Sequence, residues 1–329
     1  MRHERNLLSY DLERLAQVSN GTSGILRYAA RFRAMDTSDI PNHDCYDHEE
    51  IIEETGVFNP DVPAVSQSYE KAQKEHGLSL TLKELCSAME VSADSIKRLS
   101  IETATQSSSV EWFEKRKGRV TASIMNSVVR HVSDEGIVKG ALKTVVGNIM
   151  GYTPSFTSAA CDHGITNECK VRLQYKKLMS KTHKKFSVTE TGMHLSLSHP
   201  FIAASPDGLV TCLCCGDGLL EVKSPWTDRF LTTKEYLSKN HSLIVQTEGT
   251  CELNKEHTWF TQIQTQIFCT NRNYCDLVVG LMSVTDNIFI QRVMRDTEFI
   301  QNMVFRASIF YEKIILEEFS TQAIKSMYQ

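Results

Sequence analysis

Two short segments of the 329-residue chain carry side chains suited to hydrolytic chemistry. Asp207 lies in the turn sequence Ser205-Pro206-Asp207-Gly208, while Glu221 and Lys223 lie two positions apart in an apolar run. Because residues i and i+2 of an extended strand point to the same face, we expect Glu221 and Lys223 to project together while Val222 faces the core. A pair of carboxylates can hold Mg²⁺, and an ammonium group beside it can orient an attacking water or help to deprotonate it. This equipment is suited to metal-assisted phosphodiester hydrolysis.

Each half of this pattern has an ordinary structural explanation when taken alone. Ser-Pro-Asp-Gly is a common turn sequence, and Glu-x-Lys on a strand is usually an exposed ion pair. The glycines between the halves, Gly208, Gly216 and Gly218, allow two strands to fold back as a hairpin, which would bring Asp207 beside Glu221. The joint occurrence is the pattern of the PD-(D/E)xK nucleases, and it outweighs the two separate explanations.

Composition and charge narrow the choice of partners. The chain is 41% hydrophobic and 23% charged, which is ordinary for a globular protein, and its net charge is -4. The net charge therefore argues against a simple electrostatic coating of DNA and leaves local basic runs at 115–119, 176–177 and 181–185, for which a solvated face is the alternative. The N-terminus lacks a signal-like apolar stretch and no apolar run reaches membrane-spanning length, so we expect a soluble intracellular protein of the nucleus or cytoplasm, without a membrane partner.

The ten cysteines are scattered without regular spacing, as expected for reduced thiols. The exception is Cys212-Leu213-Cys214-Cys215 in the predicted hairpin loop. Three thiolates this close could bind Zn²⁺ if a fourth ligand came from Cys161, His163 or another chain. The paired C-x-x-C spacing of common zinc sites is missing, which favours simple loop thiols.

The remaining patterns predict the elements that position these residues. Residues 1–105 read as a helical extension of unknown role, with helices at 7–18, 81–89 and 96–105, the last preceded by a cap at Ser92. Residues 106–329 read as the nuclease domain, and Glu168 lies near the start of one of its helices. Its helices are expected at 110–117, 121–129, 139–150, 164–179, 258–270 and 298–319, and its strands at 186–190, 199–204, 218–224, 275–284 and 287–294. The predicted fold class is α/β, a PD-(D/E)xK restriction-endonuclease-like core with a mixed central sheet flanked by helices.

With these elements placed, the chain resembles the YqaJ-type viral recombinase family of PD-(D/E)xK nucleases, to which bacteriophage lambda exonuclease belongs. The resemblance covers roughly residues 107–319 and consists of four motifs in the family's order. The first, from Glu111 to Ser123, is similar to W-x-x-x-R-x-G-x-[IV]-T-A-S, and it implies that Arg116 and Ser123 bind the 5′-phosphate of a DNA end. A guanidinium and a hydroxyl at a helix N-terminus also make an anion site on physical grounds, and Thr121 or Ser123 could cap that helix.

The other three motifs supply the proposed metal site and its surroundings. The segment 163–168 resembles G-x-x-x-E at the head of a helix and implies that Glu168 approaches the metal. Asp207, Glu221 and Lys223 occupy the family's catalytic positions, and the resemblance adds the carbonyl of Val222 as a metal ligand.

The fourth motif spans residues 257–266 and contains an aromatic residue followed by Q-x-Q. It assigns Trp259, Gln262, Gln264 and Gln266 to the support of DNA or the active site. Trp259, Gln262 and Gln266 share one helix face. The family often has tyrosine at the position of Trp259, so any role of a phenol hydroxyl is absent here.

The resemblance implies a 5′→3′ exonuclease that uses Mg²⁺ or Mn²⁺, with two ions, on the ends of double-stranded DNA. Its product would be 3′ single-stranded tails for recombination or for viral or mobile-element replication, with a single-strand annealing protein as partner and a homo-oligomer as an option. Two alternatives stay open: an endonuclease on the same core, and a catalytically silent DNA-binding or assembly module. Arg116 and Ser123 favour the exonuclease, and the intact Asp207, Glu221 and Lys223 argue against the silent module.

Overall fold

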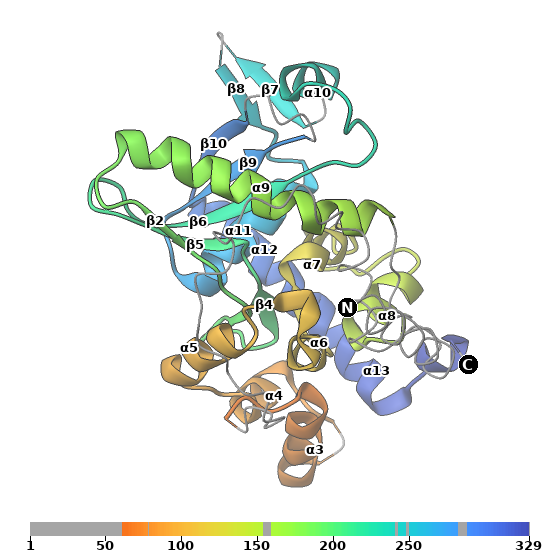
Figure 1. Ribbon diagram of the computed structural model, residues 1–329. Helices are drawn as coiled ribbons and strands as arrows, with labels where there is room; N and C mark the ends of the chain where they lie inside the picture. Colours follow the sequence, from red (N-terminus) through yellow and green to blue (C-terminus); the bar gives the residue numbers. More distant parts are fainter. Residues whose placement is uncertain are drawn as a thin grey trace, which may run out of the picture.

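A computed structural model of the chain (Figure 1) describes residues 61–77, 79–153, 159–240, 243–247, 250–281 and 288–328. The helix predicted at 7–18 lies outside these residues. Among the described residues, no helix is both long enough and apolar enough to cross a membrane.

A five-stranded mixed sheet in the order β10-β9-β6-β5-β2 forms the centre of the protein. Strand β6 runs antiparallel to β5 and parallel to β9. The strands are β2 (Ser187–Thr189), β5 (Gly208–Cys212), β6 (Gly216–Lys223), β9 (Tyr274–Val279) and β10 (Phe289–Met294). The hairpin predicted between Asp207 and Glu221 is therefore present as β5–β6, and Gly216 begins β6 with a φ of 74°, a conformation that favours glycine.

Two smaller sheets accompany the central one. A three-stranded sheet has the order β1-β4-β3, and a two-stranded sheet pairs β7 with β8. Their bounds are β1 (Val120–Thr121), β3 (His194–Leu195), β4 (Ile202–Ala204), β7 (Ile244–Thr247) and β8 (Thr250–Leu253).

Helices cover both sides of the central sheet and extend the protein at both ends (Figure 1). They are α3 (Val65–His76), α4 (Leu82–Ala88), α5 (Ala93–Glu102), α6 (Val110–Arg116), α7 (Ala122–Arg130), α8 (Lys143–Met150), α9 (Ala159–Thr182), α10 (Thr233–Lys239), α11 (Thr258–Thr270), α12 (Thr297–Phe310) and α13 (Leu316–Thr321). The helix predicted at 298–319 contains a π-helical turn at Tyr311–Ile315 between α12 and α13. The predicted cap of α5 is confirmed, because the Ser92 side chain accepts a hydrogen bond from the backbone N–H of Ser95.

The two faces of β6 pack against different helices. Leu220 and Val222 pack against Val171 and Tyr175 of α9. Leu219 belongs instead to the core on the opposite face, which includes α11. Because side chains alternate along a strand, Glu221 and Lys223 lie on the α11 face. The sequence prediction that these two side chains project together is confirmed.

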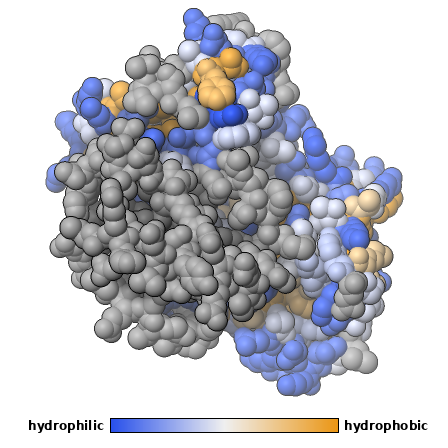
Figure 2. Space-filling view, turned by 45° about the vertical axis from the view of Figure 1, so that its right-hand side comes forward, coloured by the Kyte–Doolittle hydropathy of each residue, from blue (hydrophilic) through white to orange (hydrophobic). Residues whose placement is uncertain are grey.

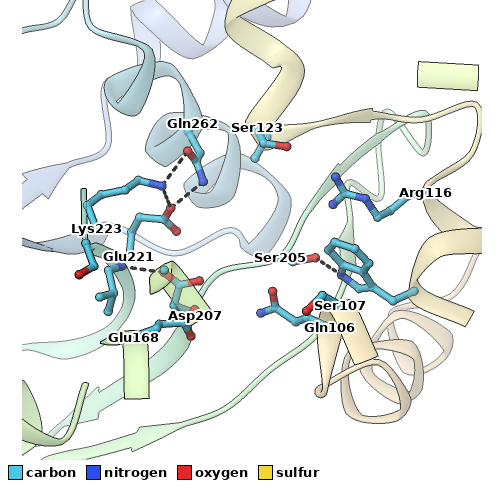
Figure 3. A pocket seen from close by; sticks show the side chains of 15 residues that line it. Gln106, Ser107, Arg116, Ser123, Glu168, Ser205, Asp207, Glu221, Lys223 and Gln262 are labelled. Carbon is cyan, nitrogen blue, oxygen red and sulfur yellow. Dashed lines mark hydrogen bonds and ion pairs between the residues drawn. The ribbon is translucent and has the colours of Figure 1, made fainter. Parts of the chain in front are cut away.

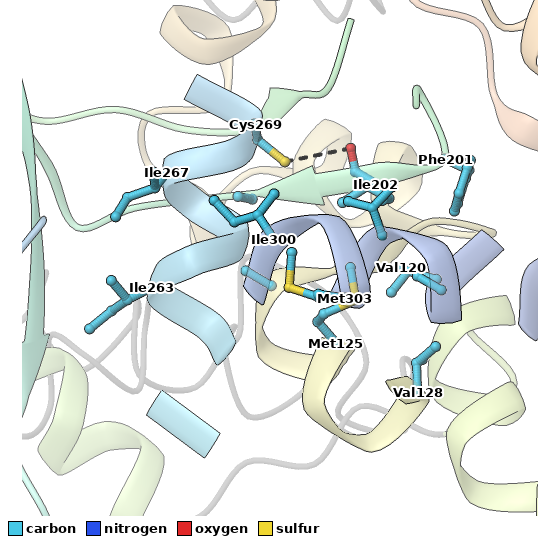
Figure 4. Close-up of a cluster of buried hydrophobic side chains, with 14 of the residues drawn as sticks. Val120, Met125, Val128, Phe201, Ile202, Ile263, Ile267, Cys269, Ile300 and Met303 are labelled. Carbon is cyan, nitrogen blue, oxygen red and sulfur yellow. Dashed lines mark hydrogen bonds between the residues drawn. The ribbon is translucent and has the colours of Figure 1, made fainter. Parts of the chain in front are cut away.

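A hydrophobic cluster behind α11 fixes its position (Figure 4). Ile263 and Ile267 of α11 are fully buried, as are Met125 of α7 and Ile202 of β4, and Met303 of α12 is 2% exposed. Full burial of such a side chain contributes about 1.5–3 kcal/mol relative to exposure. Helix α11 is thereby held by α7, α12 and β4, so the side chains of Gln262 and Gln266 approach β6 in a defined orientation.

The described helices of the N-terminal extension pack onto the rest of the protein. Val65 and Tyr69 of α3 join the largest core, and the Tyr69 ring stacks on that of Phe319 at 4.9 Å between centroids. The hydroxyl of Thr103 accepts a hydrogen bond of 2.8 Å from the backbone N–H of Met193. The domain boundary near residue 105 stays a prediction, and helices α3–α5 share their cores with the residues that follow it.

On the face shown in Figure 2, the described residues are mainly hydrophilic. Large apolar side chains are exposed at scattered positions, of which Phe230, Leu213 and Val110 are among the most accessible. The mixed sheet with helices on both faces confirms the predicted α/β class.

Candidate active site

A cavity of about 470 Å³ lies where the start of β5, the end of β6, α6 and the starts of α7 and α9 meet (Figure 3). Its lining comprises Gln106, Ser107, Trp112, Arg116, Ala122, Ser123, Gly164, Glu168, Ser205, Asp207, Glu221, Val222, Lys223, Ser224 and Gln262. Residues from all four sequence motifs therefore reach one cavity, although the motifs are far apart in the chain.

Three carboxylates occupy one wall of the cavity. Glu221 is 2% exposed, and the adjacent Asp207 accepts a hydrogen bond of 2.7 Å from the backbone N–H of Val222 through Oδ2. The backbone N–H of Asp207 donates to the carbonyl of Leu220 at 3.1 Å, so the register of the hairpin fixes the turn. Figure 3 shows the carboxyl groups of Asp207 and Glu168 next to each other and on the same side as Glu221.

This crowding of negative charge contributes to a raised pKa of Asp207. Burial raises the pKa of Asp207 well above its ordinary value, and the charges of Glu221 and Glu168 raise it further, while Lys223 and the Val222 N–H act in the opposite direction. The site therefore has a deficit of positive charge.

Glu221 is held by one ammonium and two amides. Its Oε1 accepts hydrogen bonds from Lys223 Nζ at 2.5 Å and from Gln262 Nε2 at 2.6 Å, and its Oε2 accepts one from Gln266 Nε2 at 2.6 Å. Lys223 Nζ also donates to Gln262 Oε1 at 3.1 Å. Burial lowers the pKa of Lys223, but the charges of Glu221 and Asp207 outweigh it and leave the pKa raised, so the side chain is an ammonium ion.

The other residues of the fourth motif divide between two faces of α11. The Trp259 ring centroid lies 5.8 Å from Lys223 Nζ, which places Trp259 at the edge of the site. Gln264 instead donates from Nε2 to the carbonyl of Met294 at 2.9 Å and accepts at Oε1 from the backbone N–H of Asp296 at 3.0 Å. The assignment of Gln264 to the active site is therefore wrong, because two helical positions rotate a side chain by about 200° away from Gln262.

The predicted phosphate site lies across the cavity from the carboxylates. The guanidinium of Arg116 stacks on the Trp112 ring at 4.0 Å and donates a long hydrogen bond of 3.4 Å to Thr121 Oγ1, which lies 3.2 Å from Ser123 Oγ. Burial lowers the pKa of Arg116 to about 10, so it stays charged at neutral pH. Thr121 is the N-cap of α7, but neither it nor Ser123 caps the helix in the predicted way: the Thr121 side chain makes no capping hydrogen bond.

The rest of the basic run 115–119 is not a surface patch. Lys115 is buried and donates to the carbonyl of Val62, and Lys117 pairs with Glu114 at 2.6 Å. Arg119 is fully buried and donates to backbone carbonyls, including that of Pro200 at 3.1 Å. Within this run, Arg116 alone lines the cavity.

Two residues outside the sequence motifs also shape the site. Arg172 donates from Nη1 to Glu168 Oε1 at 3.3 Å and to the carbonyl of Asp207 at 3.2 Å, and its i+4 spacing from Glu168 was a usable signal. Gln106 donates from Nε2 to the carbonyls of Thr191 and Pro206, both at 3.0 Å, and nothing in its sequence context indicated this role.

A protein-family model matches the part of the chain that contributes most of these residues. Residues 111–273 match the family model of the YqaJ-like viral recombinase domain. These residues form a YqaJ-like viral recombinase domain. The predicted family resemblance is confirmed, and the YqaJ-like domain contains Arg116, Glu168, Asp207, Glu221 and Lys223, all of which line the cavity. The family match supports a nuclease.

Several solved structures are similar to the chain. The alkaline exonuclease LHK-Exo from Laribacter hongkongensis is 27% identical, and the match covers 66% of this chain and 100% of that one with a TM-score of 0.46. The shutoff and exonuclease protein of Kaposi's sarcoma-associated herpesvirus is 10% identical, with 81% and 87% coverage and a TM-score of 0.46. A phage-related exonuclease from Haemophilus somnus is 15% identical, with 64% and 96% coverage and a TM-score of 0.42. No curated protein matches the chain.

Proposed function

We propose that the YqaJ-like domain is a divalent-cation-dependent exonuclease that removes nucleotides from the 5′ ends of duplex DNA and leaves 3′ single-stranded tails. The observation that carries this proposal is the presence, in one cavity, of a hydrolytic set and an anion-binding set. The hydrolytic set is Asp207, Glu221, Glu168 and Lys223, and the anion-binding set is Arg116 with Ser123. A site that holds a terminal phosphate beside the hydrolytic groups favours cleavage near a strand end.

The donor set fits Mg²⁺ or Mn²⁺. Asp207, Glu221, Glu168 and the carbonyl of Val222 are oxygen donors, which such hard cations prefer. A cation would offset the charge that raises the pKa of Asp207. Gln266 Oε1 is a buried acceptor with no hydrogen-bond donor among the described residues, which is a second sign that positive charge is missing here. When bound, the cation, or a pair of them, supplies Lewis-acid stabilisation of phosphoryl oxygens and lowers the pKa of water in contact with it.

Lys223 acts as an ammonium donor. Its raised pKa excludes a large neutral population near neutral pH, so it orients the attacking water or neutralises charge on the scissile phosphate, and it does not serve as a general base. Glu221 and Gln262 fix the ammonium group through hydrogen bonds of 2.5 and 3.1 Å. Gln262 and Gln266 in turn orient Glu221, which keeps its carboxylate in place when the cavity is filled.

Arg116 binds the 5′-phosphate. Among the described residues, no carboxylate pairs with this guanidinium, and its one hydrogen bond there is long and goes to a neutral hydroxyl. Trp112 holds the guanidinium plane from one side, and Ser205 fixes Trp112 by accepting a hydrogen bond of 2.9 Å from its indole N–H. The guanidinium therefore keeps N–H donors for a phosphate, which is its best-matched anion. The 3′ tails left by digestion would be the substrate of a single-strand annealing protein.

The test uses the full chain and end-labelled linear duplexes that carry either a 5′-phosphate or a 5′-hydroxyl. Each duplex is incubated with Mg²⁺, with Mn²⁺ and with no added divalent cation, and a closed circular duplex is incubated in parallel. We expect cation-dependent release of 5′ mononucleotides from linear DNA, faster with the phosphate, and an intact circle. Nicking of the circle would establish the endonuclease alternative, and binding without cleavage under any of these conditions would establish the silent module.

A further inference from the structure

Four soft metal ligands converge at the end of the β5–β6 hairpin opposite the active site. His183 follows α9, Cys212 ends β5, and Cys214 and Cys215 lie in the loop before β6. His183 Nδ1 is 3.3 Å from the sulfur atoms of Cys214 and Cys215 and 3.5 Å from that of Cys212. The sulfur atoms of Cys212 and Cys214 are 3.0 Å apart, and all four ligand atoms lie within 4.8 Å of one another.

The distances from His183 match those in a tetrahedral zinc centre. Zn–S bonds of about 2.3 Å and Zn–N bonds of about 2.0 Å place the ligand atoms of a tetrahedron roughly 3.5–3.8 Å from one another. The three distances from His183 Nδ1 to sulfur, 3.3, 3.3 and 3.5 Å, are within a few tenths of an ångström of this range, and the 3.0 Å between the sulfur atoms of Cys212 and Cys214 would lengthen on coordination. Three thiolates and an imidazole are also the donor types that select zinc over Mg²⁺ or Ca²⁺.

Backbone N–H groups approach the sulfur atoms of this cluster. The sulfur of Cys212 accepts hydrogen bonds from the backbone N–H groups of Cys214 and Cys215, and that of Cys214 accepts one from the backbone N–H of Lys184. Hydrogen bonds of this kind orient metal ligands. The backbone N–H of Leu213 donates to the carbonyl of Lys184 at 3.0 Å, which joins the loop to the segment after α9.

We propose that His183, Cys212, Cys214 and Cys215 bind one Zn²⁺ in a structural site. Four protein ligands leave no open coordination position, so the site stabilises the fold and does not take part in hydrolysis. Of the fourth ligands expected from sequence, His163 lies at the far end of α9 with its ring beside Trp226, and the side chain of Cys161 lies outside the described ones. His183 was overlooked because it precedes Cys212 by 29 residues, without a short metal-binding spacing.

This zinc site lies far from the catalytic carboxylates. Thr182 is 14 positions after Glu168 along α9, which corresponds to roughly 21 Å at 1.5 Å per residue. The zinc ion would tie the C-terminal end of α9 to the tip of the β5–β6 hairpin. Helix α9 carries Glu168, and the hairpin carries Asp207 and Glu221 at its other end. The ion would therefore fix α9 and the hairpin relative to each other at the end opposite the active site.

The experiment measures zinc in the full chain, purified without chelators and with any histidine tag removed. By inductively coupled plasma mass spectrometry, we expect about one zinc ion per chain in the wild type and in Asp207→Asn, because the site is independent of the catalytic carboxylates. His183→Ala and Cys214→Ser should lose most of the metal, whereas His76→Ala and Cys86→Ala, which remove the same residue types elsewhere, should retain it. Refolding with Co²⁺ should give the thiolate-to-metal and tetrahedral d–d absorption bands of a Cys₃His centre.

Other outcomes would overturn the proposal. A wild type that contains no zinc and gives no thiolate–Co²⁺ bands has no such site. A disulfide within the 212–215 loop, detected by mass spectrometry in the native protein, would likewise replace it. If His183→Ala fails to fold, the Co²⁺ spectrum of the wild type and the retention of zinc by Asp207→Asn still decide the question. Loss of nuclease activity alone does not bear on this site, so failure here is distinguishable from failure of the proposed function.

Discussion

The two ends of the β5–β6 hairpin differ in the chemistry of their side chains. The end that contains Asp207 and Glu221, here called the oxygen end, presents oxygen donors to the cavity, and α9 adds Glu168 to them. The end that contains Cys212, Cys214 and Cys215, here called the sulfur end, presents sulfur donors. His183, the residue just beyond α9, adds a fourth potential metal ligand. One hairpin and one helix therefore supply both the oxygen donors proposed to hold a hard cation and the sulfur and nitrogen donors proposed to hold zinc.

The two ends of the hairpin also differ in their expected effect on the stability of the fold. At the oxygen end, burial and then the neighbouring charges of Glu221 and Glu168 raise the pKa of Asp207, so its ionised form destabilises the fold when no cation is bound. At the sulfur end the ligand atoms of all four residues lie within 4.8 Å of one another. A rigid sulfur end would offset the cost of the crowded oxygen end, as is common at sites where strain serves function.

The largest effect that distinguishes the two ends is expected from Lys223→Ala. Loss of a preorganised cationic donor from the oxygen end should lower the rate of phosphodiester cleavage by about 10²–10³-fold, as for the loss of an oxyanion-hole donor. Zinc content should be unchanged. Single-turnover cleavage of a linear duplex measures the rate, and Lys71→Ala, an exposed lysine on α3, is the charge-matched control. Cleavage within twofold of the wild type would contradict the assigned role.

A smaller effect is expected from Arg116→Ala, which tests whether the oxygen end recognises a strand end. Hydrogen bonds to charged groups contribute about 1.5–3 kcal/mol, which corresponds to roughly a 10–100-fold change in specificity. We expect this loss in kcat/KM for 5′-phosphorylated duplexes and little change for 5′-hydroxyl duplexes. Arg130→Ala, at the exposed C-terminal end of α7, is the control. An equal loss on both substrates would assign Arg116 a general role in DNA binding.

Sequence patterns predicted the oxygen end well because its residues are governed by local periodicity. The i, i+2 rule placed Glu221 and Lys223 on one strand face, and the glycines predicted the hairpin that brings Asp207 beside them. The same local reasoning failed for Gln264, which the Q-x-Q pattern grouped with Gln262 and Gln266. Because Gln264 is two helical positions from each of them, its side chain lies on another face of α11 and contacts Met294.

The sulfur end was only half predicted, because its fourth ligand comes from tertiary structure. The three cysteines are close in sequence, but His183 reaches them only because α9 packs across the sheet and ends beside the hairpin tip. The basic run 115–119 failed for a similar reason. Charge in a sequence does not reveal that Lys115 and Arg119 are buried against backbone carbonyls, and only the packing of α6 makes that clear.

The smallest effect concerns stability and follows from the raised pKa of Asp207. Because its pKa in the folded protein lies above the ordinary value of 3.8, the folded state binds this proton more tightly than the unfolded state does. The resulting stability is fully present below about pH 4 and is lost as the pH rises through the raised pKa. Without added divalent cations, we therefore expect the unfolding temperature of the wild type to fall relative to that of Asp207→Asn as the pH increases from about 4.

Differential scanning fluorimetry across this pH range measures the difference, in buffers depleted of Mg²⁺ without a chelator so that zinc is retained. Asp217→Asn, an exposed position near the other end of the same hairpin, should track the wild type at every pH. Added Mg²⁺ should raise the unfolding temperature of the wild type at neutral pH and leave that of Asp207→Asn nearly unchanged, because a ligand stabilises only the state that binds it. If the Asp207→Asn protein instead unfolds at a lower temperature than the wild type at neutral pH without cations, the oxygen end is not under electrostatic strain, and the contrast between the two ends of the hairpin fails.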